Sequence, residues 1–187
     1  MERGLVLVIL GRQGSGKGTQ AARLAERYGV VHGSTGDMLR AAVAAGTELG
    51  LRAKAVMDAG NLVGDDIMIG IVDERLASDD IQAHGVLLDG FPRTTAQADA
   101  LAQILGGTGP DLAINLDVPI AEVTERMLAR GRADDTAETI ARRLDLYEAE
   151  TAPLLEWFQG RDCLAVVDGL GTEEEVFARI TQVIDAL

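Results

Sequence analysis

Apolar residues gather in short continuous runs that are separated by longer amphipathic stretches. A run in which every position is apolar suits a strand that is covered on both faces, as in a parallel sheet. Such runs predict strands at residues 5–10, 86–89, 112–116 and 163–167, with a shorter candidate at 30–31. The stretches between them predict helices at 16–28, 37–45, 48–59, 65–78, 94–105, 119–130, 136–159 and 173–186. This alternation predicts an α/β fold with a doubly wound parallel sheet of about five strands.

The first predicted strand runs directly into a glycine-rich segment, residues 11–19, with the sequence GRQGSGKGT. Glycines let successive backbone N–H groups point inward, and the helix that follows adds partial positive charge. An ordinary glycine-rich turn is the alternative, but four glycines around Lys17, between a buried strand and a helix, favour a phosphate-binding loop. Gly18 stands where most phosphate loops place Ser or Thr, so a hydroxyl ligand for Mg²⁺ would be displaced to Thr19.

A second apolar strand ends in Asp89 and is followed by Gly-Phe-Pro-Arg. In phosphate-loop proteins such a carboxylate forms the second half of the nucleotide site, where it would hold Mg²⁺ through water. The simpler alternative is a strand end before a proline-fixed turn, with Arg93 as an exposed cation. The glycine loop upstream favours the nucleotide site.

Arginines cluster between residues 126 and 143. Arg126 and Arg130 are four positions apart, so they share one flank of a helix beside its apolar stripe. On the next helix, the apolar stripe places Arg143 at its edge and Arg142 facing roughly away. We therefore expect Arg143 to be functional and Arg142 to be solvated. The alternative is that this arginine and aspartate cluster is a salt-bridged surface turn.

Composition narrows the class of ligand. The formal net charge of −13 argues against binding long nucleic acids, because that affinity depends on many cationic contacts to phosphates. Small anionic ligands fit if cations gather locally, and 15 of the 17 cationic residues are arginines, since only Lys17 and Lys54 are lysines. The single cysteine, Cys163, cannot form an intramolecular disulfide, and no Cys or His cluster has metal-ligand spacing. We expect a soluble, cytoplasmic monomer that does not enter a membrane.

The segment GSGKGTQ after a strand resembles the adenylate kinase and nucleoside monophosphate kinase group. Further segments that resemble this group span nearly the whole chain: STGDMLR at 34–40, GNLV at 60–63, GFPR at 90–93, RGRADD at 130–135 and DGLG at 168–171. The segment around 130–135 is similar to the lid of short-lid adenylate kinases and lacks the four cysteines of a zinc-bearing lid. Arg12-Gln13, Gly33 and Gly64 depart from the family pattern, and we expect Arg12-Gln13 to alter the rim of the loop more than its phosphate cradle.

The resemblance implies a single core domain, 1–187, with two small mobile inserts, an AMP-binding insert at 34–63 and a short lid at 129–136. It implies an ATP site formed by Gly14, Ser15, Gly16, Lys17, Gly18, Thr19, Arg126, Arg130 and Gly171. It implies an AMP site formed by Thr35, Arg40, Asn61, Leu62, Val63, Gly90, Phe91, Pro92, Arg93, Gln97, Arg132 and Arg143. The catalytic residues it implies are Lys17, Arg93, Arg130, Arg132 and Arg143, with Asp89 and Thr19 as ligands of Mg²⁺.

The activity that the resemblance implies is transfer of the terminal phosphoryl group of Mg·ATP to AMP, which gives two ADP. A phosphate oxygen of AMP is already anionic, so the attack needs no general base and positioning with charge stabilisation suffices. A UMP/CMP kinase is the nearest alternative, but Thr35 and Gln97 favour AMP. A non-catalytic nucleotide-binding module is a second alternative, disfavoured because the chain has no Asn-Lys-x-Asp guanine motif and such a module needs no second phosphate site.

Overall fold

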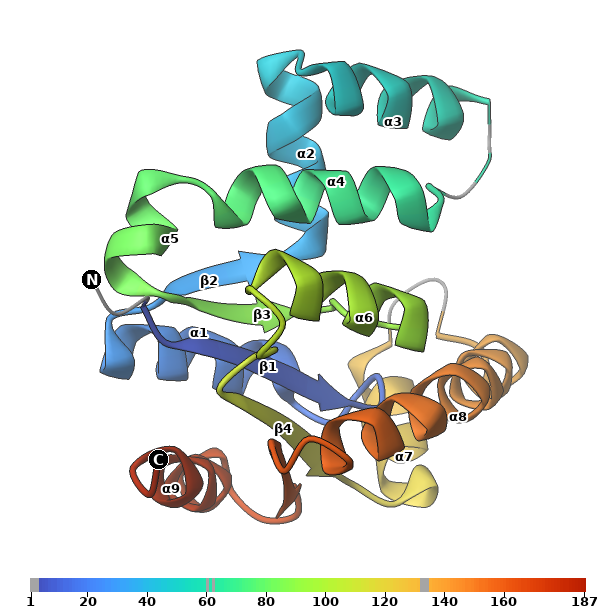
Figure 1. The fold of residues 1–187 in the computed structure, drawn as a ribbon. Coiled ribbons are helices and arrows are strands. Elements are labelled where there is room, and N and C mark those ends of the chain that lie inside the picture. Colours follow the sequence, from blue (N-terminus) through green and yellow to red (C-terminus); the bar gives the residue numbers. More distant parts are fainter. Residues whose placement is uncertain (1–3, 60, 62, 132–134) are drawn as a thin grey trace.

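A computed structural model describes residues 4–59, 61, 63–131 and 135–187. Its five parallel strands lie in the order β2-β3-β1-β4-β5, with helices on both faces (Figure 1). The strands are β1 (Val6–Gly11), β2 (Val31–Ser34), β3 (Val86–Asp89), β4 (Leu112–Asp117) and β5 (Leu164–Asp168). The helices are α1 (Lys17–Tyr28), α2 (Thr35–Ala45), α3 (Glu48–Asp58), α4 (Asp65–Leu76), α5 (Asp79–His84), α6 (Thr95–Ile104), α7 (Ile120–Arg130), α8 (Ala137–Gln159) and α9 (Glu173–Ile184). The predicted doubly wound α/β fold is confirmed.

The central strand β1 is fully buried because β3 and β4 pair with its two edges and helices cover both of its faces. Val8 and Leu10 face a core cluster that includes side chains of α4, α6 and α8, whereas Leu7 and Ile9 face a second cluster formed with α1 and α9. Successive strand residues point to opposite faces, so a continuous apolar run is what a strand covered on both sides requires.

A third apolar cluster joins α7 to the beginning of α8. It consists of Val118, Val123, Met127, Ile140 and Leu144. Helix α7 also lies against the glycine loop that follows β1: a Cβ atom added to Gly14 would lie only 3.0 Å from the Cγ atom of Met127. The packing of α7 therefore positions the arginines at its end relative to the loop.

The structure differs from the predicted elements mainly around β2 and before β3. Strand β2 extends to Ser34 because it pairs with β3 in the register Val31↔Val86, although His32, Gly33 and Ser34 are not apolar. Helix α2 accordingly begins at Thr35 rather than at 37. The predicted helix at 65–78 ends at Leu76, and the unpredicted helix α5 follows it. The local pattern of apolar residues does not predict these boundaries, because pairing with β3 extends β2 and a short turn separates α4 from α5.

Helices α2 and α3 project from one side of the molecule, and α3 is remote from the sheet (Figure 1). They pack against each other and against α4. These two helices occupy most of the segment 34–63 that the sequence predicts as an insert. Within the described residues, no helix combines the length and apolar character that crossing a membrane requires.

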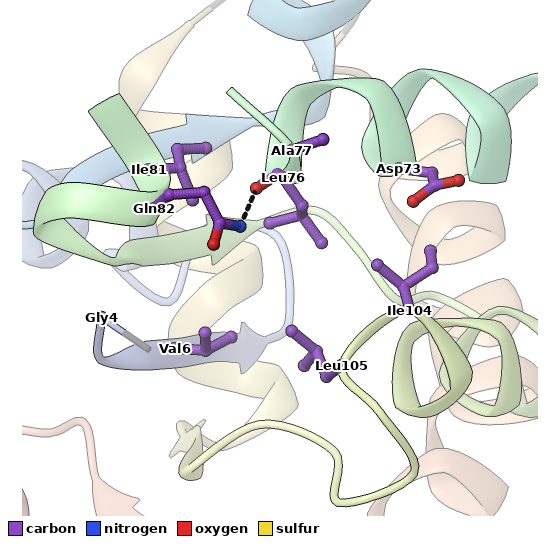
Figure 2. Close-up of a pocket in the computed structure, with 9 residues that line it drawn as sticks. All are labelled: Gly4, Val6, Asp73, Leu76, Ala77, Ile81, Gln82, Ile104 and Leu105. Carbon is purple, nitrogen blue, oxygen red and sulfur yellow. Dashed lines mark hydrogen bonds between the residues drawn. The ribbon is translucent and has the colours of Figure 1, made fainter. Parts of the chain in front are cut away.

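A small cavity of about 140 Å³ lies at the amino end of β1 (Figure 2). Val6 lines it together with residues of α4, α5 and α6, including Leu76 and Ile104. Its polar groups are the Asp73 carboxylate and the amide of Gln82, whose Nε2 donates to the carbonyl oxygen of Leu76 at 2.7 Å. The described lining contains no cation, so this cavity does not suit a phosphate.

Candidate active site

A larger cavity of about 610 Å³ opens at the carboxyl ends of β1 and β3. In doubly wound sheets, ligands bind at the carboxyl ends of the strands, at the point where the strand order reverses. Here β1 is at that point, with β3 and β2 on one side of it and β4 and β5 on the other. Its lining comes from the loop after β1, the start of α2, the end of β3 and the middle of α8. Among the predicted site residues, it brings together Lys17, Thr35, Asp89, Gly90, Arg93 and Arg143.

The glycine loop leaves the first turn of α1 open to an anion. Gly11, Gly14 and Gly16 have φ angles of 150°, 86° and 93°, which side chains rarely adopt. Gly16 caps α1 without a side-chain hydrogen bond, and the first turn has no acidic residue. The N–H groups of this turn therefore keep their capacity for a ligand, as the phosphate-loop prediction requires.

Other predicted members of the loop surround this cradle. The N–H of Ser15 donates to the carbonyl oxygen of Arg12 at 3.1 Å, which closes the turn. The Ser15 side chain is buried, and its Oγ atom has no hydrogen-bond partner among the described residues. Gly18 and Thr19 lie in the first turn of α1, where both are exposed.

Lys17 is the cation of this loop that lines the cavity, and its environment favours an anionic ligand. Burial lowers the pKa of its ammonium group, and the cation Arg93 lowers it further, whereas the Asp89 carboxylate acts in the opposite direction. A second anion, such as a phosphate, would oppose the effect of burial and stabilise the charged form. Lys17 is therefore suited to bind phosphate rather than to act as a surface charge.

Asp89 ends β3 and belongs to the wall of the cavity. Its Oδ2 atom lies 3.3 Å from Nε2 of His32, and this contact is the main reason why the pKa of His32 is raised. Among the described residues, no group of three or more His, Cys, Asp or Glu side chains could hold a metal alone. Mg²⁺ commonly keeps several waters and binds through one or two carboxylates together with substrate phosphates. One carboxylate and the exposed hydroxyl of Thr19 thus fit a metal that arrives with a nucleotide.

The turn after β3 places Arg93 beside Thr35. The Nε atom of Arg93 donates to the carbonyl oxygen of Gly90 at 2.9 Å, and a Cβ atom added to Gly90 would lie 2.8 Å from Oγ1 of Thr35. Phe91 is buried in the core, and a cis peptide bond joins it to Pro92. The apolar anchor at Phe91 holds the turn so that Arg93 reaches the cavity.

Gln97 lies behind this turn and is not part of the cavity lining. Its Oε1 atom accepts from the backbone N–H of Arg93 at 2.8 Å, and its Nε2 atom donates to Oδ1 of Asp65 at 2.7 Å. A carboxamide has two N–H donors and two acceptor lone pairs. The two bonds use one donor and one lone pair of the Gln97 carboxamide, and the residue is only 6% exposed.

The predicted residues of the AMP insert lie around the mouth of the cavity or beyond it. Arg40 is exposed and forms an ion pair with Asp37, and its guanidinium lies beside Gly36, which lines the cavity. Asn61 is exposed, and Val63 is partly buried against the core. Leu62, a further predicted site residue, lies outside the described residues.

A buried carboxylate links two of the predicted arginines. Asp135 accepts from Nε and Nη2 of Arg130 at 3.0 and 2.8 Å, and its Oδ1 atom lies 3.6 Å from Nη1 of Arg143. The side chain of Asp135 has an exposed fraction of 0%. The sequence placed Asp135 in the RGRADD segment but did not assign it a role, since adjacency to arginines does not distinguish a buried carboxylate from a surface one.

The remaining predicted arginines have different environments. Arg126 donates to Glu122 at 2.8 Å on its own helix, and Arg132 lies outside the described residues. The side chain of Arg142 is 82% exposed, whereas that of Arg143 is 32% exposed and lines the cavity. The prediction that these two neighbours face different ways is confirmed.

Gly171 lies in the connection between β5 and α9, at the same edge of the sheet as the glycine loop. Its φ angle is 113°, and a Cβ atom there would lie 2.5 Å from Oε2 of Glu175. Thr172 and Glu175 form a capping box that fixes the start of α9. The buried Gln20 of α1 donates to the carbonyl oxygen of Glu173 at 3.0 Å, so this connection is held against the helix that carries the phosphate loop.

Comparison with known proteins gives one consistent result. The adenylate kinase family model matches residues 9–163. The chain is 51% identical over 186 residues to an adenylate kinase of Stenotrophomonas maltophilia, which covers 96% of this chain and 99% of that protein. It is 47% identical over 184 residues to an adenylate kinase of Xanthomonas euvesicatoria, covering 95% of this chain and 98% of that protein.

A more distant relative shows a similar extent of likeness. The chain is 45% identical over 189 residues to an adenylate kinase of Bacteroides thetaiotaomicron, covering 98% of this chain and 100% of that protein. The similarity thus includes the glycine loop, the turn after β3 and the arginine segment rather than the loop alone. The fold, the cation-rich cavity and this similarity along almost the whole chain lead to one conclusion: the chain belongs to the adenylate kinase family of nucleotide-binding phosphotransferases.

Proposed function

We propose that the protein catalyses reversible transfer of the terminal phosphoryl group of Mg·ATP to AMP, giving two ADP. The observation that carries this proposal is the pairing of two phosphate-binding regions across one cavity. Lys17 and the open end of α1 form one region, Thr35 and Arg93 belong to the other, and Arg143 reaches the same space from α8. A protein that only binds one nucleotide has no need of the second region.

The donor nucleotide would bind with its phosphates in the glycine loop. The cradle is formed by Gly14, Ser15, Gly16, Gly18 and Thr19, with Lys17 on the outer phosphates. Arg126, Arg130 and Gly171 would complete the ATP site, the arginines on the phosphates and Gly171 on the adenine. Backbone N–H groups and a helix N-terminus stabilise phosphate charge with little reorganisation, because their positions are fixed before the ligand arrives.

The acceptor nucleotide would bind on the opposite wall. Its site would comprise Thr35, Arg40, Asn61, Leu62, Val63, Gly90, Phe91, Pro92, Arg93, Gln97, Arg132 and Arg143. Arg93 and Arg40 supply charge for the monophosphate, while Thr35 and the unused donor and lone pair of Gln97 suit the adenine edge. Arg40 is already next to Gly36 at the mouth of the cavity, and we expect its side chain to exchange Asp37 for a phosphate when AMP binds.

Phosphoryl transfer in this arrangement rests on positioning and charge stabilisation. A phosphate oxygen of AMP attacks the terminal phosphorus of ATP in line with the leaving oxygen of ADP, and no proton has to be removed from the attacking group. Lys17, Arg93, Arg130, Arg132 and Arg143 would stabilise the charge on the transferring group. Mg²⁺, when bound through Asp89 and Thr19 together with the phosphates, neutralises phosphate charge.

Two mobile parts would exclude water during transfer. We assign these to the AMP-binding insert at 34–63 and the short lid at 129–136, within a single core domain that includes residues 1–187. Closure over the nucleotides would protect ATP from hydrolysis and bring the arginines to the phosphates. We also propose that the enzyme acts as a cytoplasmic monomer, since one chain supplies both phosphate regions and its Cys163 thiol is buried and unpaired.

The decisive experiment measures ADP formation with saturating Mg·ATP and a panel of acceptors. We expect kcat/KM for AMP to exceed the values for UMP and CMP by at least ~100-fold, because a buried polar group arranged for one base is left unpaired by another. Equal use of UMP or CMP would replace this proposal with a pyrimidine nucleotide kinase. Tight ATP binding without ADP formation from any acceptor would indicate a non-catalytic nucleotide-binding module.

A further inference from the structure

Arg12, the second residue of the glycine loop, connects the loop to two other parts of the chain. Its Nε and Nη2 atoms lie 2.7 and 2.6 Å from Oε1 of Glu148 on α8. Its Nη1 atom donates to the carbonyl oxygen of Val118 at 3.0 Å and lies 3.3 Å from Oδ1 of Asp117 at the end of β4. The guanidinium also lies 5.8 Å from the centre of the Tyr147 ring.

These partners make Arg12 a structural connection rather than another phosphate ligand. The carboxylates of Glu148 and Asp117 together offset more than the single positive charge of the guanidinium. The side chain is only 19% exposed and is not part of the cavity lining, whereas its neighbour Gln13 is. A partly buried guanidinium with several fixed acceptors holds its geometry better than an exposed pair does.

The wall that Arg12 holds is the one that carries Arg143. On α8, Arg143, Tyr147 and Thr151 all line the active-site cavity. The hydroxyl of Tyr147 donates to Oδ1 of Asn115 on β4 at 3.3 Å, and burial raises the pKa of this phenol to about 12, so it remains a donor at neutral pH. Helix α8 is thus attached to the sheet at Asn115 and to the phosphate loop at Arg12.

We infer that Arg12 is a positioning residue that fixes the distance between the phosphate cradle and Arg143 by fastening the glycine loop to α8. The inference rests on the proposed role of Arg143 at the transferring phosphates. Lys17 is carried by the loop and Arg143 by α8. The distance between their side chains therefore depends on how the loop is attached to this helix. A small misplacement of a catalytic group lowers the rate of the chemical step more than it lowers the affinity for the substrate.

The first test compares the kinetics of Arg12→Ala with those of the wild-type enzyme. We expect kcat to fall by ~10-fold or more while KM for ATP and for AMP stays within about twofold, because the nucleotides still bind but the reacting groups are misaligned. Arg12→Lys keeps one charge contact and should retain an intermediate kcat, and Glu148→Gln should lower kcat in the same direction. A kcat of Arg12→Ala within twofold of wild type would overturn the inference.

A matched control lies at the other end of α1. Arg27 forms an ion pair with Asp185 at 3.1 Å and lies 5.5 Å from the ring centre of Tyr28, so like Arg12 it pairs with a carboxylate beside a tyrosine ring, but it is more exposed and lies away from the cavity. Arg27→Ala should leave kcat within about twofold of wild type. If it lowers kcat as much as Arg12→Ala does, the effect is one of general stability and the inference fails.

A double-mutant cycle separates action through Arg143 from an independent effect. In an Arg143→Ala background, Arg12→Ala should lower kcat by less than about twofold, since the group that it positions is already absent. The same loss in both backgrounds would overturn the inference. If Arg143→Ala alone keeps wild-type kcat, the proposed role of Arg143 fails as well. If Arg143→Ala is impaired and Arg12→Ala is not, only the inference about Arg12 fails.

Discussion

The two walls of the active-site cavity are built in different ways. The predicted phosphate loop is one continuous segment, 11–19, whose proposed ligand groups are backbone N–H groups held by glycine conformations and by the start of α1. The opposite wall is assembled from side chains of β2–α2, the turn after β3 and α8, and it is supported from behind by contacts such as Gln97 to the backbone of Arg93 and Asp135 to Arg143. The first wall is preorganised locally, whereas the second depends on tertiary structure and on ion pairs that a ligand can exchange.

The largest effect should come from Lys17, the charged side chain of the loop that lines the cavity. Lys17→Met should lower kcat by ~10³-fold, because it removes the cation at the transferring phosphates while the backbone cradle stays intact. Steady-state kinetics with ATP and AMP check this, with circular dichroism to verify folding. Lys54→Met is the control, since Lys54 pairs with Asp58 on the exposed surface of α3. Turnover of Lys17→Met within about threefold of wild type would contradict the assignment.

The second largest effect is expected for a side chain of the wall that depends on tertiary structure. Arg143→Ala should lower kcat by ~10²-fold or more, because its guanidinium lines the cavity, whereas Arg142→Ala should be nearly silent. The two residues are adjacent in sequence and on the same helix, so helix propensity and net charge change equally in both variants. Comparable kcat values in the two variants would show that the side-chain geometry of α8 does not decide function.

The sequence predicts the loop at 11–19 well and the wall that depends on tertiary structure poorly. The segment 11–19 carries its own signal, because glycines, lysine and the following helix are contiguous, and the strands of a buried parallel sheet are continuous apolar runs. The Arg12 contacts join residues separated by 105 and 136 positions, so no local pattern reports them. The burial of Asp135 and the pairing of β2 with β3 likewise exist only after folding. The roles assigned to the individual site residues stay predictions.

The preference for AMP as acceptor tests the wall that depends on tertiary structure at a single side chain, Gln97. Gln97→Leu should narrow the preference for AMP over UMP and CMP by ~10- to 100-fold, mainly by lowering kcat/KM for AMP, because it removes the carboxamide whose second N–H donor and second lone pair are proposed to pair with adenine. The apparent affinity for ATP should hardly change, since ATP occupies the other wall. Loss of the Asp65 contact is a second consequence, and Asp65→Ala, which removes the oxygen acceptor but leaves Gln97 in place, is the control for it. An unchanged preference for AMP would remove Gln97 from the acceptor site.

The smallest effect concerns His32, which links the end of β2 to Asp89 at the end of β3. The Asp89 carboxylate raises the pKa of His32 above its ordinary value of 6.5, with smaller help from Asp37 and against the effect of burial. A group whose pKa is higher in the folded state contributes stability that is fully present below its unfolded-state pKa and is lost as the pH rises through its folded-state pKa.

Replacing His32 with Gln should therefore lower the free energy of unfolding at about pH 5.5 more than at about pH 8.5. The difference should not exceed ~1 kcal/mol, because solvent screens this partly exposed pair. Urea unfolding of the ligand-free protein at both pH values measures it. His84→Gln is the control, because His84 forms no ion pair with the described part of the chain. If His32→Gln costs more stability at the higher pH, Asp89 is not the partner that controls the His32 charge, and the contact between β2 and β3 is of another kind.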